Sequence, residues 1–342
     1  MAAARCFLLL AIFSLTACNN PDTQPPQAVT ALAADQLAVI VNDRDPESRA
    51  IADYYAARRQ IPGDNIIHVG FEPGIGSLQP ATFQALRATV SRLTPARVQA
   101  YALAWTTPFR VGCMSVTTAF AAGYDTSFCA TTCAPTRESP YFDSDSQAPW
   151  TDFGWRPSML LAGTDSRSVH ALIERGIAAD ASHPRGSAYL VSTSDRRRNT
   201  RARFYGLAAL LQSGRFNTRI IATDSLRYRS DVMFYFTGLS NVKGLDSLSF
   251  LPGAIADHLT SSGGVLTGSK QMSSLRWLDA GATASYGTVR EPCSYTEKFP
   301  RPDIVMEHYL NGASLIEAYW KSVQWPGQGV FIGEPLAKPF AN

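Results

Sequence analysis

Short apolar runs alternate with amphipathic segments along most of the sequence. Three of these runs are "LAVIV" (37–41), "VQAYALAW" (98–105) and "DVMFYFTG" (231–238). Each has the length of a strand, and a continuous apolar run is typical of a parallel strand that is covered on both faces. The sequence therefore predicts an α/β fold in which mostly parallel sheets are flanked by helices.

The same alternation continues through the second part of the chain. There the patterns predict strands at 187–193, 218–223, 231–238, 264–268 and 282–289, and helices at 200–213, 252–263, 273–280, 302–311 and 313–323. A junction near 180–186 separates two expected α/β subdomains, 37–183 and 184–342. The first carries a long, irregular insertion at 106–157, and an insertion of that length is usually functional or held by disulfides.

The first 17 residues have the features of a signal peptide. One arginine precedes an apolar run, which is too short for a permanent membrane helix and is followed by small residues. The segment "LTAC" resembles the bacterial lipoprotein box, which implies cleavage before Cys18 and lipidation of that cysteine. We expect a membrane anchor and a flexible tether at 18–36, and Asn19 favours the outer membrane, facing the periplasm. The alternative is a secreted protein that is cleaved elsewhere.

Four cysteines remain after the signal peptide and Cys18 are set aside: Cys113, Cys129, Cys133 and Cys293. Four cysteines in an oxidising compartment fit two disulfides, for which three pairings are possible. We predict Cys129–Cys133, a small ring in a Thr-rich loop, together with Cys113–Cys293. A zinc site is the alternative, but the paired CxxC spacing is missing, so no metal or cofactor is expected.

The charge of the chain limits the partners that it is expected to bind. A formal net charge of +3 is too small to indicate a nucleic-acid-binding protein, because phosphate binding normally needs a basic face.

Polar residues cluster where predicted parallel strands end, which is where ligands of such sheets bind. The candidates for binding are Asp43, Asp45, Arg196, Arg197, Arg290 and Glu291. Arginine suits carboxylate and phosphate groups, so the run "DRRRNTRAR" (195–203) predicts a site for an acidic group. The alternatives are a solvated or salt-bridged loop for the arginines, and helix capping or Ca²⁺ binding for the two aspartates.

The second half resembles gingipain-type cysteine peptidases, which have a caspase-like fold. The resemblance rests on "DVMFYFTG" and "LDAGATASYGTV" (278–289). In that family His-Gly follows one strand and the catalytic Cys follows the next. The matching positions read Thr237-Gly238 and, approximately, Gly268-Ser269, so the resemblance implies that the catalytic pair is absent.

A relocated catalytic site is the remaining possibility for an enzyme. Cys293 or Ser240 would be the nucleophile and His258 or His308 the base. Lys243 stands at SxxK spacing from Ser240, as in penicillin-binding proteins, but the other motifs of those proteins are missing.

The chain from residue 37 onward also resembles an uncharacterised bacterial family from genomes that carry the exosortase protein-sorting system. The most specific matching phrases are "WLDAGATASYGTVREPC" and "KFPRPDIVMEHYLNGASLIEAYWKSVQWPGQGVFIGEPLAKPF". The resemblance implies a cell-surface context but no reaction. Two hypotheses follow: a non-catalytic envelope lipoprotein that binds a surface polypeptide or acidic group, and a cysteine- or serine-dependent hydrolase.

Overall fold

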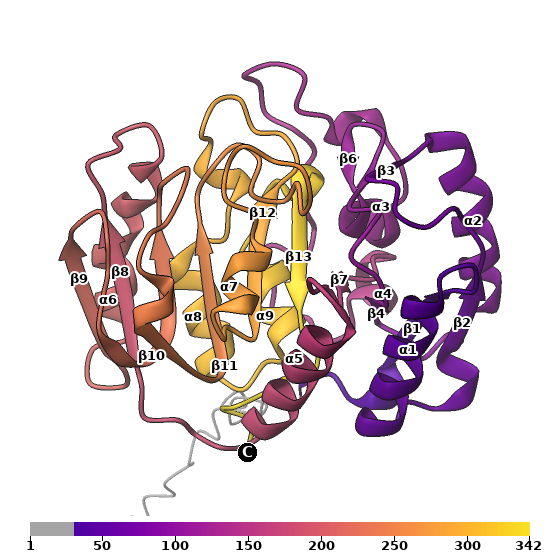
Figure 1. Ribbon diagram of the computed structural model, residues 1–342, viewed down its shortest axis with the longest axis horizontal. Helices are drawn as coiled ribbons and strands as arrows, with labels where there is room; N and C mark the ends of the chain where they lie inside the picture. The colour runs from indigo at the N-terminus through magenta and orange to yellow at the C-terminus, as the bar shows by residue number, and fades with distance from the viewer. Residues whose placement is uncertain (1–30) are drawn as a thin grey trace, which may run out of the picture.

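A ten-stranded sheet forms the centre of the protein (Figure 1). The computed structural model describes residues 31–342, so the predicted signal peptide, Cys18 and most of the tether lie outside the described residues. The strand order is β2-β1-β4-β7-β13-β12-β11-β10-β8-β9. The strands of this sheet are β1 (Leu37–Asn42), β2 (Ile66–Val69), β4 (Ala100–Leu103), β7 (Ser158–Leu160), β8 (Ser187–Ser192), β9 (Asn217–Ala222), β10 (Arg229–Thr237), β11 (Leu248–His258), β12 (Ala284–Thr288) and β13 (Gly329–Gly333).

Parallel pairing joins the strands within each half of this sheet. β2, β1, β4 and β7 are parallel neighbours, and so are β9, β8, β10, β11 and β12. β12 and β13 pair antiparallel. The predicted α/β class with mostly parallel sheets is confirmed, because the inner strands are buried and helices cover both faces.

Helices pack on both faces of the sheet. α1, α5 and α7 lie in front of it in Figure 1, and α6, α8 and α9 lie behind it. The helices are α1 (Pro46–Arg59), α2 (Pro80–Leu93), α3 (Val116–Ala122), α4 (Pro149–Phe153), α5 (Ser166–Ala179), α6 (Tyr205–Leu211), α7 (Leu275–Asp279), α8 (Pro302–Leu310) and α9 (Leu315–Lys321). No helix within residues 31–342 combines the length and the apolar character that crossing a membrane requires.

The insertion at 106–157 is more regular than the sequence predicts. It contains α3, α4 and two short strands, β5 (Arg110–Val111) and β6 (Met114–Ser115), which form a small sheet with β3 (Ser77–Leu78). α3 also contacts β7 and β13, so the insertion packs against the middle of the large sheet.

Residues 248–258 correct the prediction of a helix at 252–263. They form β11, between β10 and β12, and residues 264–268, predicted as a strand, form no strand. The segment "AIADH" has good helix formers, but strands on both sides and burial of all five residues decide the outcome. As a consequence His258 lies at the end of a strand and not on a helix.

β13 joins the two halves of the sheet, between β12 and β7. Its Ile332 pairs with Leu160 of β7 on one side, while residues 329–333 pair with β12 on the other. Phe331 stacks on Trp320 with ring centroids 4.4 Å apart and meets Tyr286 at 5.0 Å. The predicted junction at 180–186 falls between α5 and β8, and the division into two subdomains stays a prediction.

Candidate functional site

The loop after β8 crosses the carboxyl ends of the neighbouring strands. The Thr193 hydroxyl donates to the carbonyl oxygen of Gly238 at 2.7 Å, just beyond β10. A Cβ atom at Gly238 would lie 1.9 Å from the carbonyl oxygen of Arg198, so only glycine lets the loop pack this closely.

The same loop continues to the ends of β11 and β12. Arg198 donates through Nε to the hydroxyl of Thr260 at 3.1 Å, and the Thr200 hydroxyl donates to the carbonyl oxygen of Ser294 at 3.1 Å. Residues 193–200 therefore connect the carboxyl ends of β8, β10, β11 and β12. We call this part of the surface the carboxyl rim.

A buried ion pair lies beneath the rim. Arg201 and Asp257 are 1% and 0% exposed, and their nearest charged atoms are 2.5 Å apart. Burial by itself lowers the pKa of Arg201, but the Asp257 carboxylate outweighs it, so the pKa lies above its ordinary value. Arg201 also donates to the carbonyl oxygens of Thr237 and Pro300. One arginine of the basic run is thus part of the core.

His258 is fully buried at the end of β11, and both of its ring nitrogens are occupied. Nδ1 accepts a hydrogen bond from the Trp277 indole at 2.9 Å, so Nε2 carries the proton and donates to the carbonyl oxygen of Met272 at 3.1 Å. Burial lowers the pKa of His258 to about 3. A neutral imidazole without a free lone pair has no means of accepting a substrate proton, so the candidate base is a structural residue.

Cys293 is bonded to Cys133, and Cys113 to Cys129, so the predicted pairing is wrong although two disulfides are present. Side chains hold the observed partners together. The Gln328 amide donates to the carbonyl oxygens of Cys113 and Phe128, which brings Cys129 to Cys113.

A second contact places Cys133 beside Cys293. The Tyr295 hydroxyl donates to the carbonyl oxygen of Cys133 at 3.1 Å. A disulfide sulfur has no thiolate form, so Cys293 is not a nucleophile while this bond is intact.

The positions that the gingipain resemblance points to change with the strand assignment. β10 ends at Thr237, as expected, but the next strand is β11, which ends at His258. The match to Gly268-Ser269 is therefore wrong, and His258-Leu259 takes its place. Thr237-Gly238 stands where the resembled peptidases have their histidine, and His258 stands where they have their cysteine, so both expected residues are absent from their positions.

The other candidate catalytic residues are not assembled into a site. Among residues 31–342, the Ser240 hydroxyl has only a long contact with the Asn241 amide (3.4 Å), and the Lys243 ammonium makes no hydrogen bond. His308 lies on α8, where its Nε2 meets Asp143 at 3.3 Å, and burial lowers its pKa. No hydrogen bond joins Ser240 to Lys243 in the described part of the chain.

Glu291 holds the turn that follows β12. It is buried, pairs with the buried ammonium of Lys298 at 3.3 Å, and accepts hydrogen bonds from the backbone amides of Cys293 and Ser294. The prediction of Glu291 as a contact residue is wrong, because its carboxylate faces inward. Arg290, the preceding residue, is exposed.

The two aspartates of the first half have structural partners. Asp45 caps α1 by accepting from the backbone amide of Glu47 at 3.0 Å, and Asp43 pairs with His68 at 2.6 Å. Within residues 31–342 there is no group of three or more His, Cys, Asp or Glu side chains that could hold a metal ion.

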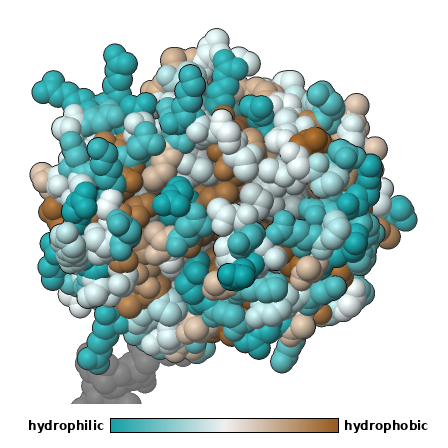
Figure 2. Space-filling model, viewed as in Figure 1, coloured by the Kyte–Doolittle hydropathy of each residue, from teal (hydrophilic) through white to brown (hydrophobic). Residues whose placement is uncertain are grey.

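Four exposed cations remain on the carboxyl rim: Arg196, Arg197, Lys270 and Arg290. None has a hydrogen bond or ion pair within the described part of the chain. The nearby acids Asp195 and Asp224 are bound by Arg198 and Ser194, respectively. In the space-filling view, hydrophilic side chains project from the upper left margin, above the strand ends (Figure 2). The four cations give this rim a positive potential that is suited to an anion.

Lys270 is the member of this set that the sequence reasoning missed. Its neighbour Gln271 accepts hydrogen bonds from the Thr260 hydroxyl at 2.9 Å and from the amide of Ser262 at 2.8 Å. These bonds fasten the loop after β11 to the rim. The only signal in the sequence was the position of Lys270 after a strand, and that strand was placed wrongly.

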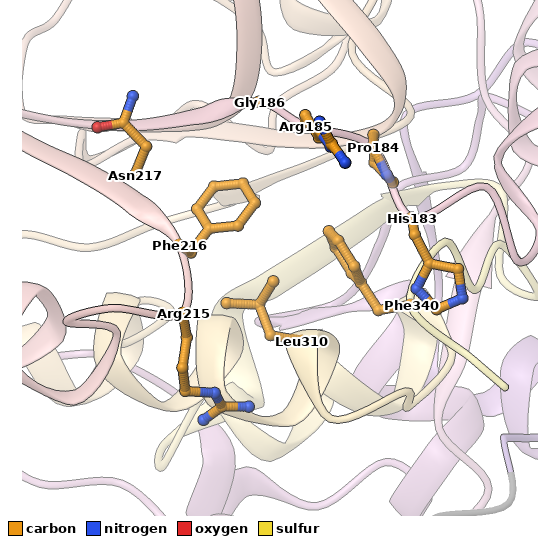
Figure 3. Close-up of a pocket in the computed structure, with 9 residues that line it drawn as sticks. All are labelled: His183, Pro184, Arg185, Gly186, Arg215, Phe216, Asn217, Leu310 and Phe340. Atoms are coloured by element: carbon orange, nitrogen blue, oxygen red, sulfur yellow. The ribbon is translucent and has the colours of Figure 1, made fainter.

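A pocket of about 390 Å³ opens at the other ends of β8 and β9 (Figure 3). Phe216, Leu310 and Phe340 point into it and form an apolar floor. Arg215 at its margin is used by Glu307, at 3.1 Å. The pocket suits an apolar group. The guanidinium of Arg215 is already paired with Glu307 and is therefore not free to bind a ligand.

Comparisons with known proteins assign no family to the chain. No protein-family model matches it, and no curated protein matches it. A solved structure described as "Structure of Protease" is similar over 90% of this chain and 78% of its own, with 9% sequence identity and a TM-score of 0.46. We derive no activity from a similarity at that level.

Proposed function

We propose that the protein is a non-catalytic, lipid-anchored envelope protein that binds an acidic group of a surface polypeptide at the carboxyl rim. The anchor rests on the signal peptide and Cys18, and the sorting context rests on the resemblance to the exosortase-associated family. Both belong to the proposal.

One observation carries the non-catalytic part of this proposal. The candidate nucleophile and the candidate base at the rim are both committed to the fold. Cys293 is in a disulfide and His258 has hydrogen bonds at both ring nitrogens. Nucleophilic catalysis needs a free nucleophile beside a base that can accept its proton, and Cys293 with His258 does not supply this pair.

The ligand class follows from the four exposed cations. Three of them are arginines, whose planar guanidinium groups pair with carboxylates and phosphates through two hydrogen bonds. Hydrogen bonds of Arg198 and Thr200 hold the loop that carries Arg196 and Arg197. The backbone at these two arginines is therefore already fixed before a ligand binds. Little ordering is then required when an acidic segment binds.

Binding of a fluorescent oligoglutamate peptide tests this proposal. The double variant R196Q/R197Q should bind about tenfold more weakly than the unchanged protein, at roughly 0.7 kcal/mol for each lost ion pair. R92Q/R185Q removes the same charge from exposed positions away from the rim and is the matched control.

Two results would contradict the proposal. Equal losses in both double variants would mean that net charge and not the rim governs binding. Cleavage of the peptide, detected by mass spectrometry after incubation, would support the hydrolase hypothesis instead.

A further inference from the structure

Arg87 of α2 is a half-buried arginine without a counter-ion. Its guanidinium makes no hydrogen bond or ion pair with any of residues 31–342, and its Nε atom is buried without a partner. The group lies against Gly123, where a Cβ atom would be 3.4 Å from its Cζ. The nearby Arg156, by contrast, has partners. Its Nε donates to the Val98 carbonyl oxygen at 3.0 Å, and its Cζ lies 3.4 Å from the centre of the Trp150 ring.

An unpaired charge in such a position is unfavourable. Burying the Nε of a guanidinium without giving it a partner costs free energy, and folds usually avoid this by pairing the group. Burial lowers the pKa of Arg87, and no carboxylate is close enough to raise it again. A residue that costs stability without forming a contact is typical of a binding site.

Arg87 also lines a cleft of about 640 Å³ between α2 and the segment that follows α3. Ala88 and Ala122 contribute apolar surface, and Tyr124 contributes its ring. The Tyr124 hydroxyl lies 3.4 Å from the Cys113 sulfur, so the Cys113–Cys129 disulfide supports this wall. The volume is that of a small organic ligand and far exceeds that of an inorganic anion.

The charges of the cleft specify the charge of the ligand. Arg137 is the second arginine in the lining, and it pairs with Asp125 at 2.9 Å. Asp125 also accepts from the backbone amide of Ser127 at 2.9 Å. Two positive side chains and one negative side chain leave one net positive charge, which a single carboxylate would balance.

We propose that this cleft binds the free C-terminal carboxylate of a peptide, with Arg87 as the residue that pairs with it. The apolar wall takes the last side chain of the peptide. The cleft lies in the first half of the molecule and is lined by none of the rim residues, so this site is independent of the rim.

A panel of N-acetyl tripeptides with free carboxylates, each compared with its C-terminal amide, tests the site by calorimetry on the whole mature protein. At least one free acid should bind, and its amide should bind at least tenfold more weakly. Arg87→Gln should weaken binding of that acid at least tenfold. Arg92→Gln, on the same helix but exposed, should leave it unchanged.

Thermal unfolding separates a binding role from a structural one. Because Arg87 has no partner, Arg87→Met should raise the melting temperature of the ligand-free protein by about 2 °C while abolishing binding. A lower melting temperature would show that Arg87 stabilises the fold. The proposal is overturned by that result, by equal binding of acids and amides, by a panel in which no acid binds, or by inorganic phosphate that binds more tightly than the peptides.

Discussion

At the scale of single residues, the second half of the sheet uses its reactive side chains for the fold. Arg201 with Asp257 and Glu291 with Lys298 are buried ion pairs, and His258 is neutral between two hydrogen bonds. Residues of these types at strand ends suggest catalysis in a sequence, but here they are buried and paired with one another or with neighbouring groups of the fold. The exposed cations are the residues left for a ligand.

His258 makes stability depend on pH in a defined window. Its pKa is about 3 in the folded protein and 6.5 when unfolded, so below pH 6.5 the unfolded chain takes up a proton that the folded protein does not. The free energy of unfolding should therefore decrease by about 2 kcal/mol between pH 7 and pH 5 from this residue alone. Urea unfolding of the protein and of His258→Gln at both pH values measures the contribution of His258 to the free energy of unfolding.

His308→Gln is the control for that experiment. Burial lowers the pKa of His308 too, but this histidine is partly exposed and has Asp143 beside it. Its replacement should change the pH dependence less than that of His258. An unchanged pH dependence in His258→Gln would mean that the buried imidazole is not the group responsible.

Some single residues could be placed from the sequence and others could not. Helix capping is one of the roles that the sequence predicts for Asp45, and Asp45 is a cap, because a cap is decided by neighbours in the chain. Glu291 was predicted to contact a ligand, yet its partner Lys298 is seven residues further on, across a turn that no local pattern predicts.

At the scale of elements, the sequence predicts most strands and helices but not β11. Continuous apolar runs predict strands such as β1 and β10. β11 contains Gly253, Ala254 and Ala256, and only its neighbours β10 and β12 make it a strand. The position of His258 depends on this one element, which is why the sequence pattern places this histidine on a helix.

The two disulfides should contribute differently to stability. Cys113–Cys129 closes a loop of 16 residues and Cys133–Cys293 one of 160 residues. In the chain-entropy model these loops correspond to about 3 and about 5 kcal/mol. Urea unfolding of C113A/C129A and C133A/C293A should show the larger loss in the second variant.

Peptide mapping without reductant checks the pairing itself. It should recover a peptide joining Cys133 to Cys293, and Cys293 should react with iodoacetamide only after reduction. A Cys113–Cys293 peptide, or rapid alkylation of Cys293 in the unreduced protein, would contradict the structure and reopen the thiol mechanism.

At the scale of the whole molecule, the predicted attachment to the membrane depends on lipidation of Cys18. Cys18→Ser should move the protein from the membrane to the soluble fraction, because each buried CH₂ of an acyl chain contributes about 0.8 kcal/mol to anchoring. Cys6→Ser, within the same signal sequence, is the control and should leave fractionation unchanged. If Cys18→Ser stayed with the membrane, the lipoprotein prediction would be wrong.

The α/β class of the whole molecule could be predicted, whereas the position of β13 could not. Local patterns identify strands, but the order of strands in a sheet depends on packing between distant segments. Phe331 of β13 packs against Trp320 and Tyr286. No spacing in the sequence shows that β13 lies between β7 and β12.

The position of β13 also governs when the chain is able to fold. Residues 329–333 follow all other strands of the sheet in chain order, yet they fill its centre. Until they arrive, β7 and β12 both have an unpaired edge, and open edges of this kind recruit other chains. An incomplete chain thus carries two adhesive edges, and protection from aggregation is needed until the final strand has been delivered.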